Sequence, residues 1–208
     1  NFTVRINDCV FDSNVINPFE ISHGAGLYTQ ANDIQISNSS FYGNETDHGA
    51  AVYFGVDVNL QHDAVMNNCH IYNNRNSSGG IESGSSIFLD VGALTLNNCI
   101  IDHNAGFPIH KTSTFGGIST VDLNHCTVAY NYLYILLTSS ELNVTNSILW
   151  NERDLEYSLI GNGITPVLKN SVIRNWDGLE GENIIKAYPE FTDEFDFKPR
   201  EYSRCING

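Results

Sequence analysis

The chain has 208 residues, 41% of them hydrophobic and 11% aromatic, which is enough to bury the core of one ordinary domain. Asp and Glu number 24 against 10 Lys and Arg, and the resulting net charge of −14 excludes favourable binding to nucleic acid or to anionic membranes. No stretch approaches the ~18 consecutive apolar residues that a membrane helix needs, so membrane insertion is excluded as well.

One phrase recurs along the whole chain. It is complete at residues 5–14, 35–44, 65–74, 95–104 and 122–131. At 145–151 and 169–175 it recurs with one residue fewer between the central small residue and the last Asn. Its central small residue is Cys9, Ser39, Cys69, Cys99, Cys126, Ser147 and Ser171, with spacings of 30, 30, 30, 27, 21 and 24 residues. Self-similarity at such a period indicates stacked units with loop insertions on some copies.

The apolar residues within each unit alternate with a period of two. Ile34 and Ile36 alternate before the Asn-rich turn of one copy, and Cys99 and Ile101 alternate after the turn of another. This period is typical of strands, whereas a helical repeat needs a 3.6-residue pattern and a leucine-rich repeat needs a leucine frame, and neither occurs. The sequence therefore predicts an all-β protein, a parallel β-helix or solenoid of about seven coils of 21 to 30 residues.

The coils are expected to span residues 1–175, and residues 176–208 are expected to close the same domain. One Asn of each copy falls above the next, so these side-chain amides are predicted to bond from coil to coil across ~4.8 Å while the Asn tolerates a left-handed bend. The predicted ladder consists of Asn14, Asn44, Asn74, Asn104, Asn131, Asn151 and Asn175.

The Cys and Ser positions of the phrase are predicted to be small, inward-facing residues. Stacked coils leave Cβ atoms near ~4.8 Å, above the ~3.8 Å that a disulfide prefers, so Cys69, Cys99 and Cys126 are expected to be free thiols. Ser fills the same position in three copies, which indicates selection for size. No Cys or His pair has metal-ligand spacing, and no metal site or cofactor is predicted.

Three glycine-rich phrases, HGAGLY at 23–28, HGAAVY at 48–53 and SGSSIF at 83–88, accompany the repeats, and the chain ends in YPEFTDEFDFKPREYSRCING. With the repeated phrase they resemble secreted right-handed parallel β-helix proteins, in particular bacterial surface proteins with a choice-of-anchor Q domain. That group closes with D-P-x-F-x-D, an aromatic-rich strand and S-x-x-I-x-x-G. Here Tyr188 replaces the opening Asp, whereas Ser203 and Ile206 match the final element and Gly208 stands one residue before the position of its Gly. The resemblance covers essentially the whole chain and implies secretion or cell-surface localisation, not a reaction.

Two outward columns are candidate carbohydrate-binding surfaces. If Leu27 points inward, Tyr28, Tyr53 and Phe88 point outward on neighbouring coils and form an aromatic ladder on which sugar faces could stack. The alternative is that loop insertions fold over these rings and bury them. A second column, comprising Asp12, Tyr42, Tyr72 and Asp102, could extend such a groove, with a mixed solvated face as its alternative.

Catalysis receives little support from these columns. Asp12 and Asp102 would lie three coils apart, roughly 14 Å, beyond the ~6.5–9.5 Å of an inverting glycosidase. The basic residues are scattered, and the SHG at 22–24 only faintly resembles the G-H-G of pectin-hydrolysing β-helices, so His23 and His48 are interpreted as turn or coil-interior residues. Catalytic residues are therefore not assigned.

The ends of a solenoid need covers because they expose strand edges and core. The C-terminal end has bulky candidates in Trp176, Tyr188, Phe191, Phe195, Phe197 and Tyr202. At the N-terminal end we expect upstream coils or a neighbouring subunit. The predicted function is that of a non-catalytic extracellular or cell-surface element, structural or adhesive, that contacts a polysaccharide or surface glycan. The alternatives are a fragment of a carbohydrate-active enzyme, lyase or hydrolase, and a self-assembling filament subunit.

Overall fold

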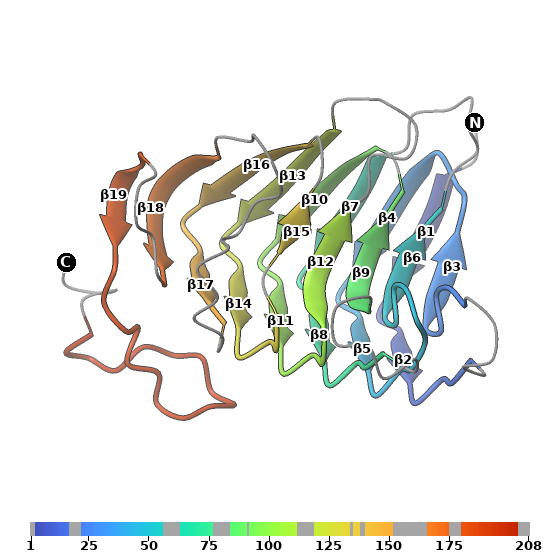
Figure 1. The fold of residues 1–208 in the computed structure, drawn as a ribbon, viewed down its shortest axis with the longest axis horizontal. Helices are drawn as coiled ribbons and strands as arrows, with labels where there is room; N and C mark the ends of the chain where they lie inside the picture. Colours follow the sequence, from blue (N-terminus) through green and yellow to red (C-terminus); the bar gives the residue numbers. More distant parts are fainter. Residues whose placement is uncertain are drawn as a thin grey trace.

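Each of the first six copies of the repeated phrase forms two strands separated by a bend, the last forms the single strand β18 (Val167–Ile173), and the copies stack into a parallel β-helix (Figure 1). The computed structural model describes residues 3–16, 22–55, 63–76, 84–90, 92–111, 119–133, 135–137, 140–151, 166–174 and 180–203. Within these residues, no helix is long and apolar enough to cross a membrane.

The first strand of each coil is the longer one and pairs in parallel with the first strand of the next coil. Ile36, Met66 and Leu96 occupy the same register position in successive coils and are fully buried. These strands are β1 (Thr3–Asn7), β4 (Asp33–Ser37), β7 (Asp63–Asn67), β10 (Ala93–Asn97), β13 (Ser119–Asn124) and β16 (Ser140–Thr145).

The second strand follows the bend and brings Phe41, Ile71 and Ile101 into one buried column. These strands are β2 (Val10–Asp12), β5 (Ser40–Tyr42), β8 (His70–Tyr72), β11 (Ile100–Asp102), β14 (Thr127–Ala129) and β17 (Ile148–Trp150). A separate five-stranded sheet forms the third wall from β3 (Leu27–Thr29), β6 (Val52–Phe54), β9 (Ser85–Leu89), β12 (Phe107–Lys111) and β15 (Leu136–Leu137).

The last strands join and extend the solenoid. β18 (Val167–Ile173) spans the last copy of the phrase and pairs with both β16 and β17, so it links the first two walls. β19 (Glu182–Ile185) then pairs in parallel with β18, so the segment predicted to close the domain adds one more strand before it leaves the sheet. In Figure 1 this segment continues from β19 into loops beneath the lower ends of the neighbouring strands.

The predicted asparagine ladder is confirmed from Asn14 to Asn151, whereas Asn175 lies outside the described residues. Each link is a side-chain amide bond of 2.8–3.0 Å, as from Asn104 Nδ2 to Asn131 Oδ1 at 2.8 Å. The left-handed backbone expected of Asn occurs at the bend between the two strands of the phrase, as in Asn38, Asn68 and Asn98 with φ of 50°, 53° and 53°. The described ladder asparagines do not adopt it, but the residue before a ladder position does in five of the coils, as in Asn73 and His103 with φ of 54° and 52°.

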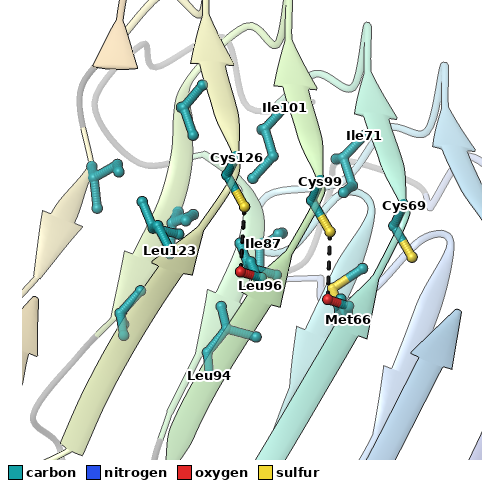
Figure 2. Close-up of a cluster of buried hydrophobic side chains, with 14 of the residues drawn as sticks. Met66, Cys69, Ile71, Ile87, Leu94, Leu96, Cys99, Ile101, Leu123 and Cys126 are labelled. Atoms are coloured by element: carbon teal, nitrogen blue, oxygen red, sulfur yellow. Dashed lines mark hydrogen bonds between the residues drawn. The ribbon is translucent and has the colours of Figure 1, made fainter. Parts of the chain in front are cut away.

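The small column of the phrase lies in the core, as predicted. Cys69, Cys99 and Cys126 are free thiols and are buried. Cys9 is also a free thiol but is only half-buried, and Cys205 lies outside the described residues. Figure 2 shows the thiol of Cys99 directed at the carbonyl oxygen of Met66, 3.5 Å away, and that of Cys126 at Leu96. Because the Ser147 hydroxyl makes the same kind of bond to Leu123, size and a single donor explain the Cys and Ser exchange.

The first coil is less well covered than the others. Its inward-facing Ile6 and Phe11 are only partly buried, whereas their register partners Ile36 and Phe41 are 0% exposed. Val10 is 65% exposed, and β1 and β2 form the two edges of the large sheet. Apolar side chains of the first coil therefore face solvent.

Candidate functional site

The first predicted column, Tyr28, Tyr53 and Phe88, is stacked as expected but is not an exposed row. The ring centroids of Tyr28 and Tyr53 are 5.3 Å apart, and those of Tyr53 and Phe88 are 4.9 Å apart. Tyr28 is 49% exposed, whereas Tyr53 and Phe88 are only 6% and 5% exposed. The expectation of an accessible ladder is therefore wrong for Tyr53 and Phe88, which are buried as in the alternative, while the covering of these rings by loop insertions stays a prediction.

Imidazole rings pack over this column. His23 meets Tyr53 edge-on at 4.5 Å, and His48 and His110 lie 5.0 and 4.9 Å from Phe88. The Tyr53 hydroxyl donates a 2.6 Å hydrogen bond to Asp90, and burial followed by this bond raises the pKa of the phenol. His23 and His48, which were interpreted as turn or coil-interior residues, pair with each other in a parallel β-bridge and pack on the rings of this column.

The second predicted column lies at the surface along β2, β5, β8 and β11. Tyr42 and Tyr72 are adjacent in register, partly exposed and stacked with centroids 4.8 Å apart. A side-chain hydrogen bond with Asp12 raises the pKa of the Tyr42 phenol, and desolvation raises that of Tyr72. These two rings are the part of the predicted site that remains accessible.

Asp102, at the end of this column, was expected to be an exposed carboxylate but is buried. It is 3% exposed and holds two imidazoles, with His70 Nε2 at 2.5 Å and His103 Nδ1 at 2.7 Å. The His70 ring also stacks on Tyr72, 4.2 Å away. Sequence reasoning missed both histidines, although His70 sits two residues before Tyr72 and therefore shares its face of the strand.

The closing segment continues the row of rings. Phe195 stacks on His103 at 5.2 Å, and the opposite neighbour of His103 is Tyr130 at 5.4 Å. The hydroxyls of Tyr130 and Tyr188 are 2.8 Å apart. We call the partly or fully exposed rings Tyr42, Tyr72, His70, His103, Tyr130 and Tyr188 the side aromatic row.

The C-terminal aromatics were expected to cover the end of the solenoid. Their described contacts instead run along its side, where Tyr188 meets Trp150 at 5.4 Å and Phe195 meets His103. Phe191 is buried, whereas Phe195 and Tyr202 are 71% and 66% exposed, and Trp176 lies outside the described residues. Covering of the end by this segment stays a prediction.

A pocket of about 660 Å³ opens between the closing segment and the solenoid. Its aromatic lining consists of Tyr130, Tyr188, Phe191 and Tyr202, and its charged lining of Glu190, Asp193, Glu194 and Arg200. Tyr130 therefore belongs both to this pocket, which we call the closing-segment pocket, and to the side aromatic row. Sequence reasoning identified several of these residues, but as an end cap.

The acidic residues of the pocket already have structural roles in part. Asp193 Oδ1 accepts backbone hydrogen bonds from Asp196 and Phe195 at 2.7 and 2.8 Å, and these bonds lower the pKa of its carboxyl. Among the described residues, no group of three or more His, Cys, Asp or Glu is placed to hold a metal ion. Rings, carboxylates and one guanidinium are the groups that this surface offers to a ligand.

A family model described as the right handed beta helix region matches residues 3–177. This match covers most of the chain and agrees with the parallel stacking of the described strands, so the predicted handedness and fold are confirmed. No curated protein matches the chain.

Proposed function

The chain belongs to the right-handed β-helix family, and from this premise we propose that it is a non-catalytic saccharide-binding element of a secreted or cell-surface protein. The observation that carries the proposal is the side aromatic row, which runs from Tyr42 across successive coils to Tyr130 and ends at the closing-segment pocket. A polysaccharide or surface glycan lying across the coils is the partner that this surface fits.

The physical basis is a row of flat rings carried by successive coils. Tyr42 and Tyr72 lie in register on adjacent strands, so their rings follow the solenoid axis. Sugars have apolar faces that stack on such rings, while the phenol and imidazole groups supply hydrogen bonds at the ring edges. Asp102 fixes His70 and His103, so these rings are held in place before a ligand binds.

A second function, that of a carbohydrate-active enzyme, has one observation in its favour. The closing-segment pocket brings Arg200 to a wall that also holds Glu190 and the phenol of Tyr188. A cation beside carboxylates is the arrangement that lyases and hydrolases use to stabilise charge on a sugar. Arg200, however, already donates to the Tyr202 hydroxyl at 2.9 Å and to the Thr192 carbonyl at 3.2 Å, and we favour binding for this reason.

The test is a glycan-array screen of the purified protein, with the double variant Tyr42→Ala plus Tyr72→Ala compared with wild type. Tyr28→Ala is the matched control, because Tyr28 is an exposed stacked tyrosine on the third wall. We expect the double variant to lose binding and the control to keep it. Unchanged binding by the double variant, or binding to no glycan, would contradict the proposal, and release of shortened sugar chains would support the enzyme instead.

A further inference from the structure

The rings of the side aromatic row cover one another's faces. Tyr42 and Tyr72 stack with centroids 4.8 Å and planes 17° apart, and His70 stacks on Tyr72 at 4.2 Å and 29°. Because Tyr42 and Tyr72 are register partners on neighbouring strands, their stacked planes lie across the solenoid axis. The row therefore turns ring edges outward, and a sugar that stacks face-on needs a ring with an uncovered face.

Phe195 on the closing segment supplies such a face. Its ring stacks on His103, with centroids 5.2 Å and planes 19° apart, and Tyr130 stacks on the same imidazole at 5.4 Å and 29°. Two rings at these separations cannot share one face of an imidazole. Tyr130 belongs to the coil after that of His103, so Phe195 lies on the face directed at the preceding coil, which carries Tyr72. Phe195 is 71% exposed, so its other face is open.

The closing segment holds this ring in place. Phe195 lies in a loop whose base is closed by a hydrogen bond from the Thr192 amide to the Lys198 carbonyl at 3.0 Å. The Phe195 amide donates to Asp193 Oδ1 at 2.8 Å, and Phe191, which precedes the loop, is buried. An aromatic side chain has few rotatable bonds, so a ring fixed in this way loses little conformational entropy when a ligand stacks on it.

Hydrogen-bonding groups accompany the open face. Asp102 bonds both His103 and His70. Because His103 is the ring on which Phe195 stacks, His70 is one carboxylate away from that stack. His70 uses Nε2 for its bond to Asp102 and its side chain is 40% exposed, so Nδ1 can bond a sugar hydroxyl. Tyr72, on which His70 stacks, adds a phenol. An apolar ring face beside such groups matches the apolar face and the hydroxyl rim of a sugar.

We propose that the open face of Phe195 is the stacking platform for the terminal sugar of a glycan, and that His70 and Tyr72 bind the hydroxyls of this sugar. The inference rests on the saccharide-binding function above and deepens it by naming the class of ligand, which is a chain end rather than an internal segment. The stacked planes lie across the solenoid axis, so a glycan that runs along the row meets the Phe195 face at its end. An internal sugar cannot stack there, because its chain would continue into the ring.

The first experiment is calorimetric titration of the full chain with cellohexaose, chitohexaose, mannohexaose and laminarihexaose. A hexasaccharide that binds is then compared with longer soluble chains of the same sugar and linkage. We expect the same number of protein molecules per glycan chain at every length, since a longer chain has no additional ends. A number of bound protein molecules that rises with chain length would show binding to internal segments and would overturn the inference.

The second experiment repeats the titration with variants of the closing segment. Phe195→Ala should weaken binding of the hexasaccharide about tenfold, the loss expected for one aromatic stacking contact. Phe195→Tyr keeps the ring and should bind as wild type does. Tyr202→Ala is the matched control and should keep its affinity, because Tyr202 is another exposed ring of the closing segment but bonds Arg200. Equal thermal midpoints of these variants show that lost binding is not a folding defect.

The outcomes separate this inference from the proposed function. Unchanged affinity of Phe195→Ala would overturn the role of Phe195, and loss of binding in Tyr42→Ala plus Tyr72→Ala would then leave the proposed function standing. Binding of no glycan on the array or in titration would overturn both.

Discussion

His70 Nε2 lies 2.5 Å from Asp102 Oδ1, although the two residues are 32 positions apart in the chain. The contact joins β8 to β11, and the second oxygen of the same carboxylate holds His103 at 2.7 Å. A single buried carboxylate therefore fixes two rings of the side aromatic row.

Asp102→Asn should destabilise the fold by about 1–3 kcal/mol, because an amide replaces a buried ionic acceptor of two imidazoles. It should also weaken glycan binding by releasing His70 and His103. Urea denaturation and the glycan array measure the two effects. The exposed Asp63→Asn on β7 is the control, and equal effects of both substitutions would contradict the role of Asp102.

Asn104→Ala should cost about 2–4 kcal/mol of unfolding free energy. Asn104 donates to Asn131 Oδ1 and the Ile71 carbonyl, and it accepts the backbone and side-chain donors of Asn74. Its loss leaves several buried hydrogen-bonding groups without partners. Each such group costs about 1–3 kcal/mol of stability, and relaxation of the structure around the substitution reduces the total. Asn14→Ala removes an exposed member of the same ladder and should lower the free energy of unfolding by well under half as much as Asn104→Ala. Chemical denaturation of both variants measures the difference. Similar losses of stability at both positions would contradict the prediction that burial determines how much a ladder asparagine stabilises the fold.

His110 should make the protein sensitive to mild acid. Burial, followed by repulsion from His48, lowers its pKa to about 4. The unfolded chain, with a His pKa of about 6.5, then binds more protons than the folded one as pH falls from 6.5 to 4, so stability is lost across this window. Between pH 7 and pH 4.5 the free energy of unfolding of His110→Phe should therefore fall by about 2 kcal/mol less than that of wild type.

Denaturation midpoints at the two pH values measure this difference. His125→Asn is the control, because His125 is exposed and has the left-handed backbone that Asn adopts at the equivalent Asn98. Its acid response should match wild type. An unchanged acid response in His110→Phe would rule out titration of His110 as the cause.

The cysteines should differ in reactivity. Hydrogen bonds with the thiols of Cys126 and Cys69, together with burial, raise the pKa of Cys99, so its thiolate is scarce. In a Cys205→Ser background, iodoacetamide should modify the half-buried Cys9 in the native protein and leave the three buried thiols intact. Peptide mass spectrometry reads out each site, with urea-unfolded protein as the control. Rapid native labelling of Cys99 would contradict its burial.

Repetition made most of the fold predictable. A strand that pairs in register with its own next copy places like residues above one another, so the spacing of Cys69, Cys99 and Cys126 specified both the register and the small core column. The ladder from Asn14 to Asn151 followed from the same logic. The left-handed residues next to the ladder did not, because the positions that adopt this conformation share no residue type: they are Ser13, Gly43, Asn73, His103 and Tyr130.

Alternation identified the side of the strand on which a residue lies, but not what covers it. Tyr53 and Tyr42 both point away from the core by parity, yet Tyr53 is buried beneath histidines of the third wall and Tyr42 is partly exposed. The fate of Tyr53 depends on side chains from other coils, and no local pattern encodes their packing.

By itself, the sequence determined a parallel solenoid, its coil length, its core column and its asparagine ladder, because each depends on hydrogen bonds and packing between identical positions of consecutive repeats. Only the tertiary structure decided that Asp102 clamps two histidines and that the closing segment lies along Tyr130 and His103 to form a pocket. The Asp102 clamp joins different positions of neighbouring repeats, and the closing segment belongs to no repeat, so neither contact follows from the pairing of identical positions.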